Sequence, residues 1–136
     1  MPDLARTSPN DLDTVRQDLE AALKDQGFGI LSEIDVQAIF KQKLDVDHEG
    51  HRILGVCNPN FGKEVLDVDR DLALLLPCPV TLHEVESGTE VKVLDPERVF
   101  GLATAEQQQT LNPLAREVRE RLDAALRQAV PTPRSA

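Results

Sequence analysis

The stretch Ile53-Leu54-Gly55-Val56-Cys57-Asn58-Pro59 decides how the fold of this 136-residue chain is predicted. Residues 53–57 form a continuous apolar run, which is typical of a strand that is covered on both faces inside a sheet. Asn58 can cap a helix, and Pro59 suits the first helical position because proline has no N–H to lose there. The stretch therefore predicts a central β-strand followed directly by a helix over about 59–67.

Before this stretch, the sequence predicts a long amphipathic helix over about 9–26. Ser8-Pro9 is a capping residue followed by proline, and Asp11 stands three residues after Ser8, close to a capping box. Gly27 stands where a left-handed residue commonly ends a helix. The apolar stripe of this helix consists of Leu12, Val15, Leu19, Ala22 and Leu23.

A short strand and a second helix connect that helix to the central strand. Residues 28–34 are apolar and partly β-branched, which favours a strand. Asp35 can cap a helix with the apolar stripe Val36, Ile39, Phe40 and Leu44, and residues 45–51 form a polar loop. Residues 4–7 could supply one more strand at an edge of the sheet.

The remainder of the chain predicts a hairpin and a last helix. Residues 80–85 and 89–94, joined through Ser87-Gly88, indicate a β-hairpin near residues 80–94. Asn112-Pro113 predicts the start of a C-terminal amphipathic helix over about 113–129, which Pro131 stops. No repeat or linker divides the chain, so we expect one domain over 1–130 and a flexible tail over 131–136.

The order of these elements predicts an α+β fold, a two-layer α/β sandwich in which helices lie on a mixed β-sheet. Strands that alternate with helices come first, and the hairpin follows them. A hairpin after such a unit tends to leave an exposed strand edge, which a second copy of the chain can cover. We therefore expect a homodimer.

The charge of the chain argues against nucleic acid as a partner. The 24 acidic and 15 basic residues give a net charge of −9, and no cluster of basic residues stands out. No apolar run approaches the ~18 residues that span a bilayer, and the acidic start at Met1-Pro2-Asp3 does not resemble a secretion signal. We expect a cytoplasmic protein without nucleic-acid or membrane partners.

Two cysteines are the candidate functional residues. Cys57 closes the central strand beside the start of a helix, where open α/β sheets place ligands. The helix dipole and unpaired N–H groups there favour a thiolate, whereas burial favours the neutral thiol. We expect the first effect to be somewhat larger, so that the pKa of Cys57 lies modestly below the ~8.5 of a free cysteine. Cys78 stands between Pro77 and Pro79, a stiff segment that is either a ligand lining or simply the entry to the hairpin. Both cysteines are expected to be free thiols.

The histidines do not predict a metal site. His48 and His51 are close in sequence, but His83 follows Cys78 by five residues, which places these two on opposite faces of a strand. The chain has no Cys-x-x-Cys or His-Glu-x-x-His motif. Residues 45–50 imitate the start of a calcium loop, but Val56 stands where the bidentate Glu belongs. We expect no metal, and the sequence identifies no cofactor.

Three segments of the chain resemble one family. They are residues 27–36 (GFGILSEIDV), Cys57-Asn58-Pro59, and Leu76-Pro77-Cys78 at the start of the hairpin. In order and spacing they are similar to the domain of unknown function 302, a prokaryotic family, over about residues 9–100. The resemblance implies a small α+β sandwich that forms dimers and has no established activity. Leu82-His83-Glu84, where related hairpins are expected to carry an aromatic residue, departs from the pattern, as does Pro79.

The two family motifs, Cys57-Asn58-Pro59 and Leu76-Pro77-Cys78, contain the two cysteines that are the candidate functional residues. We therefore predict a site for a small anionic ligand, lined by Cys57, Asn58, Pro59, Pro77 and Cys78, in which Asn58 caps the helix and orients its N–H groups. One alternative is a thiol-dependent enzyme or redox protein that uses Cys57 as nucleophile and Cys78 as resolving thiol. Another is a purely structural homodimeric interaction domain. The sequence leaves open whether the chain is an enzyme.

Overall fold

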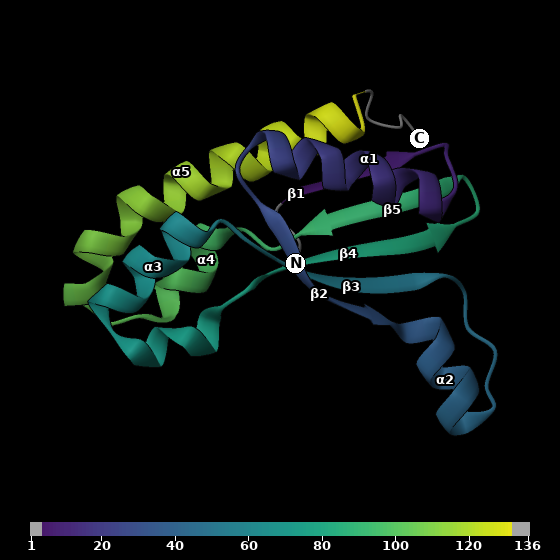
Figure 1. Cartoon of the computed structure of the whole chain (residues 1–136), viewed down its shortest axis with the longest axis horizontal. Coiled ribbons are helices and arrows are strands. Elements are labelled where there is room, and N and C mark those ends of the chain that lie inside the picture. Colours follow the sequence, from purple (N-terminus) through teal and green to yellow (C-terminus); the bar gives the residue numbers. More distant parts are fainter. Residues whose placement is uncertain (1–3, 132–136) are drawn as a thin grey trace.

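A five-stranded sheet organises the chain, of which the computed structural model describes residues 4–131. The strand order is β1-β5-β4-β3-β2, and each neighbouring pair is antiparallel. Figure 1 shows the strands beneath two long helices. The strands are β1 (Leu4–Ser8), β2 (Gly29–Asp35), β3 (His51–Cys57), β4 (Cys78–Val85) and β5 (Gly88–Val93).

The α+β sandwich is confirmed, but the sheet is antiparallel rather than mixed. The difference arises at α2 (Val36–Leu44), which follows β2 and is capped by Asp35, whose Oδ1 accepts from the N–H of Ala38 at 3.0 Å. A helix that connects parallel strands has to cross over the face of the sheet. Instead, α2 projects away from one end of the sheet, and β3 returns beside β2 in the opposite direction (Figure 1).

The strand predictions are confirmed in their places within the sheet. β3 lies between β2 and β4, β1 is an edge strand, and β4 and β5 form the expected hairpin. Helices, however, cover only one face of β3, the face that carries the buried Leu54 and Val56. On the other face Gly55 is closed over locally by Pro77, whose Cγ lies 2.6 Å from where a Cβ on Gly55 would stand.

The main core lies between the sheet and two helices, α1 (Leu12–Asp25) and α5 (Ala105–Ala129). Most of the apolar stripe predicted for the first helix is buried there, from Val15 to Leu23. Burying such side chains contributes about 1.5–3 kcal/mol each relative to exposure, which makes this layer the main source of stability. The fully buried large side chains of this layer include Leu19, Leu23, Leu54, Leu82, Val91, Leu122 and Leu126.

A smaller second core forms a lobe at one end of the sheet. It joins α3 (Pro59–Val68), the 3₁₀ helix η1 (Arg70–Leu75), α4 (Pro96–Val99) and the 3₁₀ turn η2 (Phe100–Leu102) to the first half of α5. The helix predicted to start at Asn58-Pro59 is confirmed as α3. The apolar residues 72–76, which have no diagnostic period, lie largely in η1.

Helix α1 begins later than Ser8-Pro9 predicts. Ser8 is the last residue of β1, where it pairs with Thr89 of β5, and the helix starts at Leu12. The cap is Asp11, whose Oδ1 accepts from the N–H of Thr14 at 2.8 Å. The prediction was wrong because pairing to β5 holds Ser8 in the sheet. The predicted end of this helix is confirmed, since Gly27 has the left-handed backbone conformation expected there, with a φ of 81°.

Helix α5 begins earlier than Asn112-Pro113 predicts. It starts at Ala105 with a capping box between Thr104 and Gln107, and Pro113 lies inside it. An interior proline removes one backbone donor and costs a helix about 3 kcal/mol. The capping box and the complete burial of Leu111 and Ala115 offset that cost.

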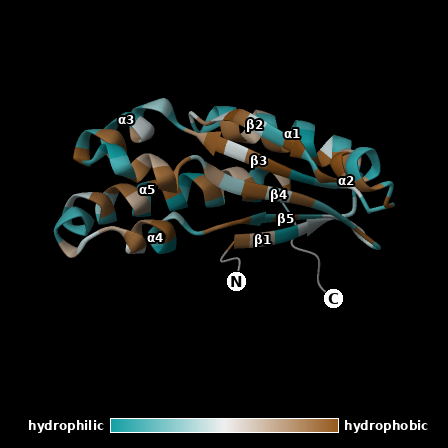
Figure 2. Cartoon of the chain, turned by 90° about the horizontal axis from the view of Figure 1, so that it is seen from below, coloured by the Kyte–Doolittle hydropathy of each residue, from teal (hydrophilic) through white to brown (hydrophobic). Residues whose placement is uncertain are grey.

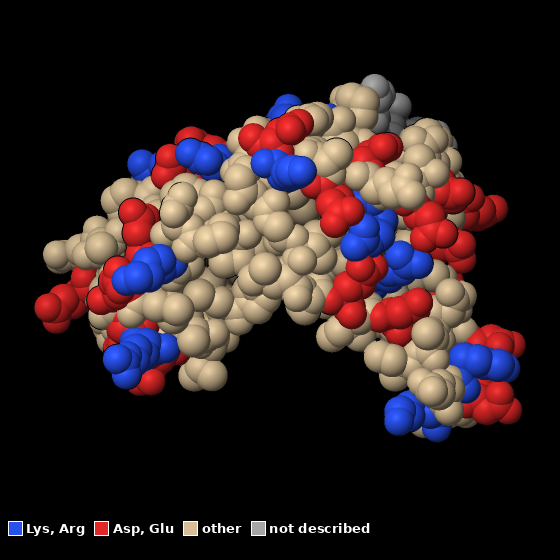
Figure 3. Space-filling view, in the orientation of Figure 1, with Lys and Arg blue, Asp and Glu red and all other residues tan. Residues whose placement is uncertain are grey.

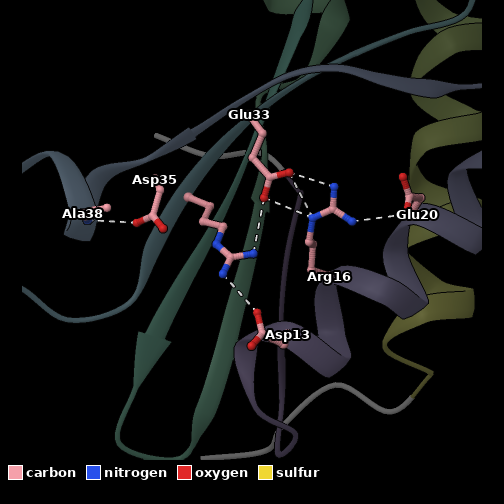
Figure 4. Close-up of polar contacts among 7 residues, drawn as sticks. Asp13, Arg16, Glu20, Glu33, Asp35 and Ala38 are labelled. Atoms are coloured by element: carbon pink, nitrogen blue, oxygen red, sulfur yellow. Dashed lines mark hydrogen bonds and ion pairs between the residues drawn. The ribbon is translucent and has the colours of Figure 1, made fainter.

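An ion-pair network fastens α1 to the edge of the sheet where α2 begins (Figure 4). Arg16 of α1 contacts Glu33 of β2 at 2.7 Å and Glu20 at 3.1 Å. Arg52 of β3 contacts the other oxygen of Glu33 at 3.3 Å and Asp13 of α1 at 3.0 Å. The network ties β2 to α1 and β3 at Glu33, two residues before the Asp35 that caps α2.

Within residues 4–131 no helix is both long enough and apolar enough to cross a membrane. Most of the tail predicted over 131–136 lies outside the described residues.

Candidate functional site

The structure brings three of the five predicted site residues together. Cys57, Asn58 and Cys78 line one small pocket of about 20 Å³. Pro77 lines a different groove, and Pro59 forms the first turn of α3. A pocket of about 20 Å³ holds one water at most. The other residues that line it are Phe28, Phe61, Gly62, Val65, Leu76, Phe100 and Val118.

The N-terminus of α3 beside this pocket already has partners for its N–H groups. Oδ1 of the buried Asn58 accepts from the N–H groups of Asn60 at 3.0 Å and Phe61 at 3.4 Å. The N–H of Gly62 donates to the Asn58 carbonyl at 2.9 Å, and Pro59 has no N–H. A helix N-terminus binds an anion through unpaired N–H groups. The Asn58 side chain therefore occupies the place that an anion would need.

Both cysteines are free thiols, as expected, but their pKa values are shifted upward. Burial raises the pKa of Cys57, and the N–H of Gly62 opposes this more weakly. Burial, together with the nearby Cys57, raises the pKa of Cys78 to about 11. The depressed pKa expected for Cys57 is thus wrong, because the apolar pocket outweighs the helix terminus. Protonated thiols are poor nucleophiles at neutral pH.

A larger exposed surface is the face of the sheet opposite α1 and α5, which we call the open face. Residues Ile53 and Thr81 lie on it, because their neighbours Leu54 and Val80 point into the core and strands alternate. Figure 2 views the sheet from this side, with the lobe at one end and α2 at the other. Figure 3 shows the hollow between them.

Exposed apolar side chains occur at both ends of the open face. Leu44 of α2 is 65% exposed, and α2 buries none of its residues. At the opposite end, Leu74 and Leu102 are 88% and 78% exposed. They line a groove of about 380 Å³ with Pro77, Pro79 and neighbouring residues of η1 and α4.

Sequence reasoning missed this face. The stripe of α2 indicates a helix that packs against the sheet, whereas in the structure Ile39 and Leu44 are exposed and Val36 and Phe40 are only half-buried. Leu102 lies in η2, which follows α4 directly, and neither element was predicted, although Asp95-Pro96 at the start of α4 carries the same cap-and-proline signal as Asn58-Pro59.

Cys78 and His83 lie on opposite faces of β4, as predicted, since Cys78 lines the small pocket beside α3 and His83 pairs with His51 on the open face. Across the described residues, no three His, Cys, Asp or Glu side chains are arranged to hold a metal ion.

The chain is similar to proteins without an assigned activity. The family model described as "Domain of unknown function DUF302" matches residues 4–129. A solved structure with the same fold is the crystal structure of an uncharacterized conserved DUF302 protein from Bacillus stearothermophilus. It is 24% identical with a TM-score of 0.83, and the match covers 93% of this chain and 96% of that one. No curated protein is significantly similar to the chain.

Proposed function

This chain belongs to the DUF302 family, and because that description states no activity, we propose from its own geometry that it is a self-associating module whose open face binds the open face of a second copy. The observation that supports this is the distribution of apolar surface on one concave face. A projecting helix, α2, stands at one end and an apolar groove at the other.

The two ends of the face are complementary to one another. A two-fold axis through the middle of the open face would exchange them, so that each copy's α2 meets its partner's groove. Leu44 and Ile39 of α2 would then cover Leu74 and Leu102 of the partner, and the four exposed side chains would leave water together. The outer strand β1 is not needed for this contact.

A ligand site or reactive thiol at Cys57 receives less support. The pocket that Cys57 shares with Cys78 has room for about one water, and the N–H groups of α3 are partnered by Asn58. The raised pKa values of both thiols also work against a nucleophile. Of the three functions that the sequence leaves open, self-association is the one supported by the exposed apolar side chains at both ends of the open face.

The experiment is the mass of the chain in solution, measured by light scattering across concentrations up to about 100 µM. We expect twice the 15.0 kDa of one chain for the wild type and the single-chain mass for Leu44→Glu and Leu102→Glu. The matched control is Ala21→Glu, which adds the same charge to the exposed side of α1. A monomeric wild type, or a dimer that withstands both leucine variants, contradicts the proposal.

A further inference from the structure

All three histidines of the chain meet on the open face at the base of α2. His51 of β3 and His83 of β4 are opposite one another in the sheet, with ring centres 4.8 Å apart. His48, in the loop after α2, places its Nε2 3.3 Å from Nδ1 of His51. Glu49 completes the group, with Oε1 2.7 Å from His83 Nε2 and Oε2 3.6 Å from His48 Nδ1.

This cluster connects the sheet to residues 36–50, which we call the arm. Within the arm, the Gln37 side-chain amide donates to the His48 carbonyl at 2.9 Å, and the ring of Phe40 meets His48 edge-on at 5.0 Å. From the arm to the sheet run the contacts of His48 with His51 and of Glu49 with His83. At the end of the arm, the Gly50 carbonyl also accepts from the N–H of Glu84 at 2.8 Å, and the Gly50 N–H donates to Glu84 Oε1 at 3.3 Å. Since α2 buries none of its own side chains, these contacts help to fix its position, and the backbone hydrogen bond between Gly50 and Glu84 does not depend on pH.

The contact between His48 and His51 requires a proton on only one of the two facing nitrogens. A hydrogen bond between ring nitrogens needs one N–H and one lone pair, so at least one of the two rings has to be neutral. When both rings are protonated, two N–H groups face each other, and the hydrogen bond is replaced by repulsion between two cations.

The surroundings do not neutralise a fully protonated cluster. The charged groups nearest the three rings are Glu49 from the arm, and Lys92 and Glu90 from β5, which pair with each other at 3.1 Å. Asp47, next to His48, is paired with Lys41 at 3.3 Å, and Glu84 lies on the face of β4 opposite His83, where it accepts from the N–H of Gly50. The residues of α2 that contact the cluster, Gln37 and Phe40, do not titrate. Three histidinium ions and Lys92 would therefore face two carboxylates.

We propose that the histidine cluster is a pH-sensitive latch, which holds the arm against the sheet near neutral pH through the contact of His48 with His51 and releases it when both of these rings are protonated. The direction agrees with the pKa of His51, which is lowered from its ordinary 6.5, first by burial and then by the charges of His83 and His48. A lowered pKa means that the latched form binds fewer protons than the released form. Latching is thus fully present above pH 6.5 and weakens as the pH falls below it.

The test is the mobility of the arm measured by ¹⁵N relaxation between pH 7.5 and pH 5.2, which stays above the isoelectric point near 4.7. We expect backbone order parameters in residues 36–50 to fall from about 0.85 to below about 0.6, while those of α1 and α5 stay unchanged. The ring signals of the three histidines report protonation in the same samples, and the loss of order should follow the protonation of both His48 and His51.

The matched variant is His48→Gln with His51→Gln, which can keep a hydrogen bond but cannot titrate. We expect it to remove the pH dependence of arm mobility. Order parameters that stay constant while the rings titrate, in the wild type and in the Leu44→Glu chain alike, overturn the latch, and so does an unchanged pH response in the double variant.

One consequence rests on the proposed function: because α2 belongs to the proposed contact, acid should raise the dimer dissociation constant at least about tenfold. The relaxation measurement is therefore repeated in the Leu44→Glu chain. If that monomer still releases its arm in acid, the latch holds whatever the mass of the wild type. A monomeric wild type contradicts self-association alone, and a rigid arm at both pH values contradicts the latch alone.

Discussion

The thiol of Cys57 is subject to two opposing influences, the N–H of Gly62, which favours a thiolate, and an apolar pocket, which disfavours it. The structure places the sulfur in the pocket, so burial has the larger effect. Cys78 is buried more deeply and has no comparable donor among the causes of its shift. At the scale of single residues, the two cysteines therefore resemble core side chains.

We predict that both cysteines react slowly with iodoacetamide in the folded protein. At pH 7.5 a thiol with a pKa of about 11, as for Cys78, is ionised over a hundredfold less than a free cysteine of pKa ~8.5. Labelling rates of Cys57→Ser and Cys78→Ser, each with one remaining thiol, measure the two sites separately. Native labelling of Cys57 faster than that of free cysteine would restore the nucleophile hypothesis.

Asn58 supplies a second residue-scale prediction, because it caps α3 from a buried position. Asn58→Ala removes the acceptor for the N–H groups of Asn60 and Phe61 and should lower the free energy of unfolding by about 1 kcal/mol. Urea denaturation measures the loss. Asn58→Asp keeps an acceptor there, so a loss as large as that of alanine would contradict the capping role.

At the scale of elements, Glu33 links three parts of the fold, because it contacts Arg16 of α1 and Arg52 of β3 from its own place in β2 (Figure 4). Hydrogen bonding from Arg16 is the largest cause that lowers the pKa of Glu33 below its ordinary 4.5. The folded state therefore binds fewer protons at Glu33 than the unfolded state does. Its contribution to stability is complete above pH 4.5 and is lost as the pH falls through the lowered pKa.

We predict that Glu33→Gln lowers the free energy of unfolding by about 1 kcal/mol at pH 7, and by less in acid, where the wild type loses the same ion pairs. The matched control is Glu20→Gln, since Glu20 contacts only one end of Arg16 and is more exposed. Its effect should be close to zero. Equal losses for the two variants, or a loss at Glu33 that grows in acid, would contradict this account of the network.

At the scale of the whole molecule, the distribution of charge on the surface bears on which partners the protein can bind. Acidic and basic side chains are interspersed on the surface that Figure 3 shows, and the net charge is −9. We predict no specific complex with duplex DNA at physiological salt, because such binding depends on many Lys and Arg contacts to phosphates. Fluorescence anisotropy of a labelled duplex tests this, and a tight, salt-sensitive complex would contradict it.

The sequence by itself determined the features that depend on neighbouring residues. The caps at Asp35 and Asn58, the left-handed Gly27, the hairpin and the inner strand β3 are set by local backbone chemistry and apolar runs. Two further local signals mark helix starts that were not predicted: Asp95-Pro96 begins α4, and the capping box of Thr104 and Gln107 begins α5.

Only the tertiary structure decided the features that depend on contacts between distant segments. Ser8 lies in a strand because it pairs with β5, and α5 continues past Pro113 because the side chains on either side of that proline are buried. At both sites the local signal is that of a helix start. The apolar stripe of α2 looks the same in sequence whether it meets a sheet or water, so its exposure could not be predicted. The meeting of the three histidines could not be predicted either, because they lie up to 35 positions apart in the sequence. They share one face because β3 and β4 pair in a register that places His51 opposite His83. Residue spacing specifies periodicity, whereas the partner of each face depends on how the whole chain packs.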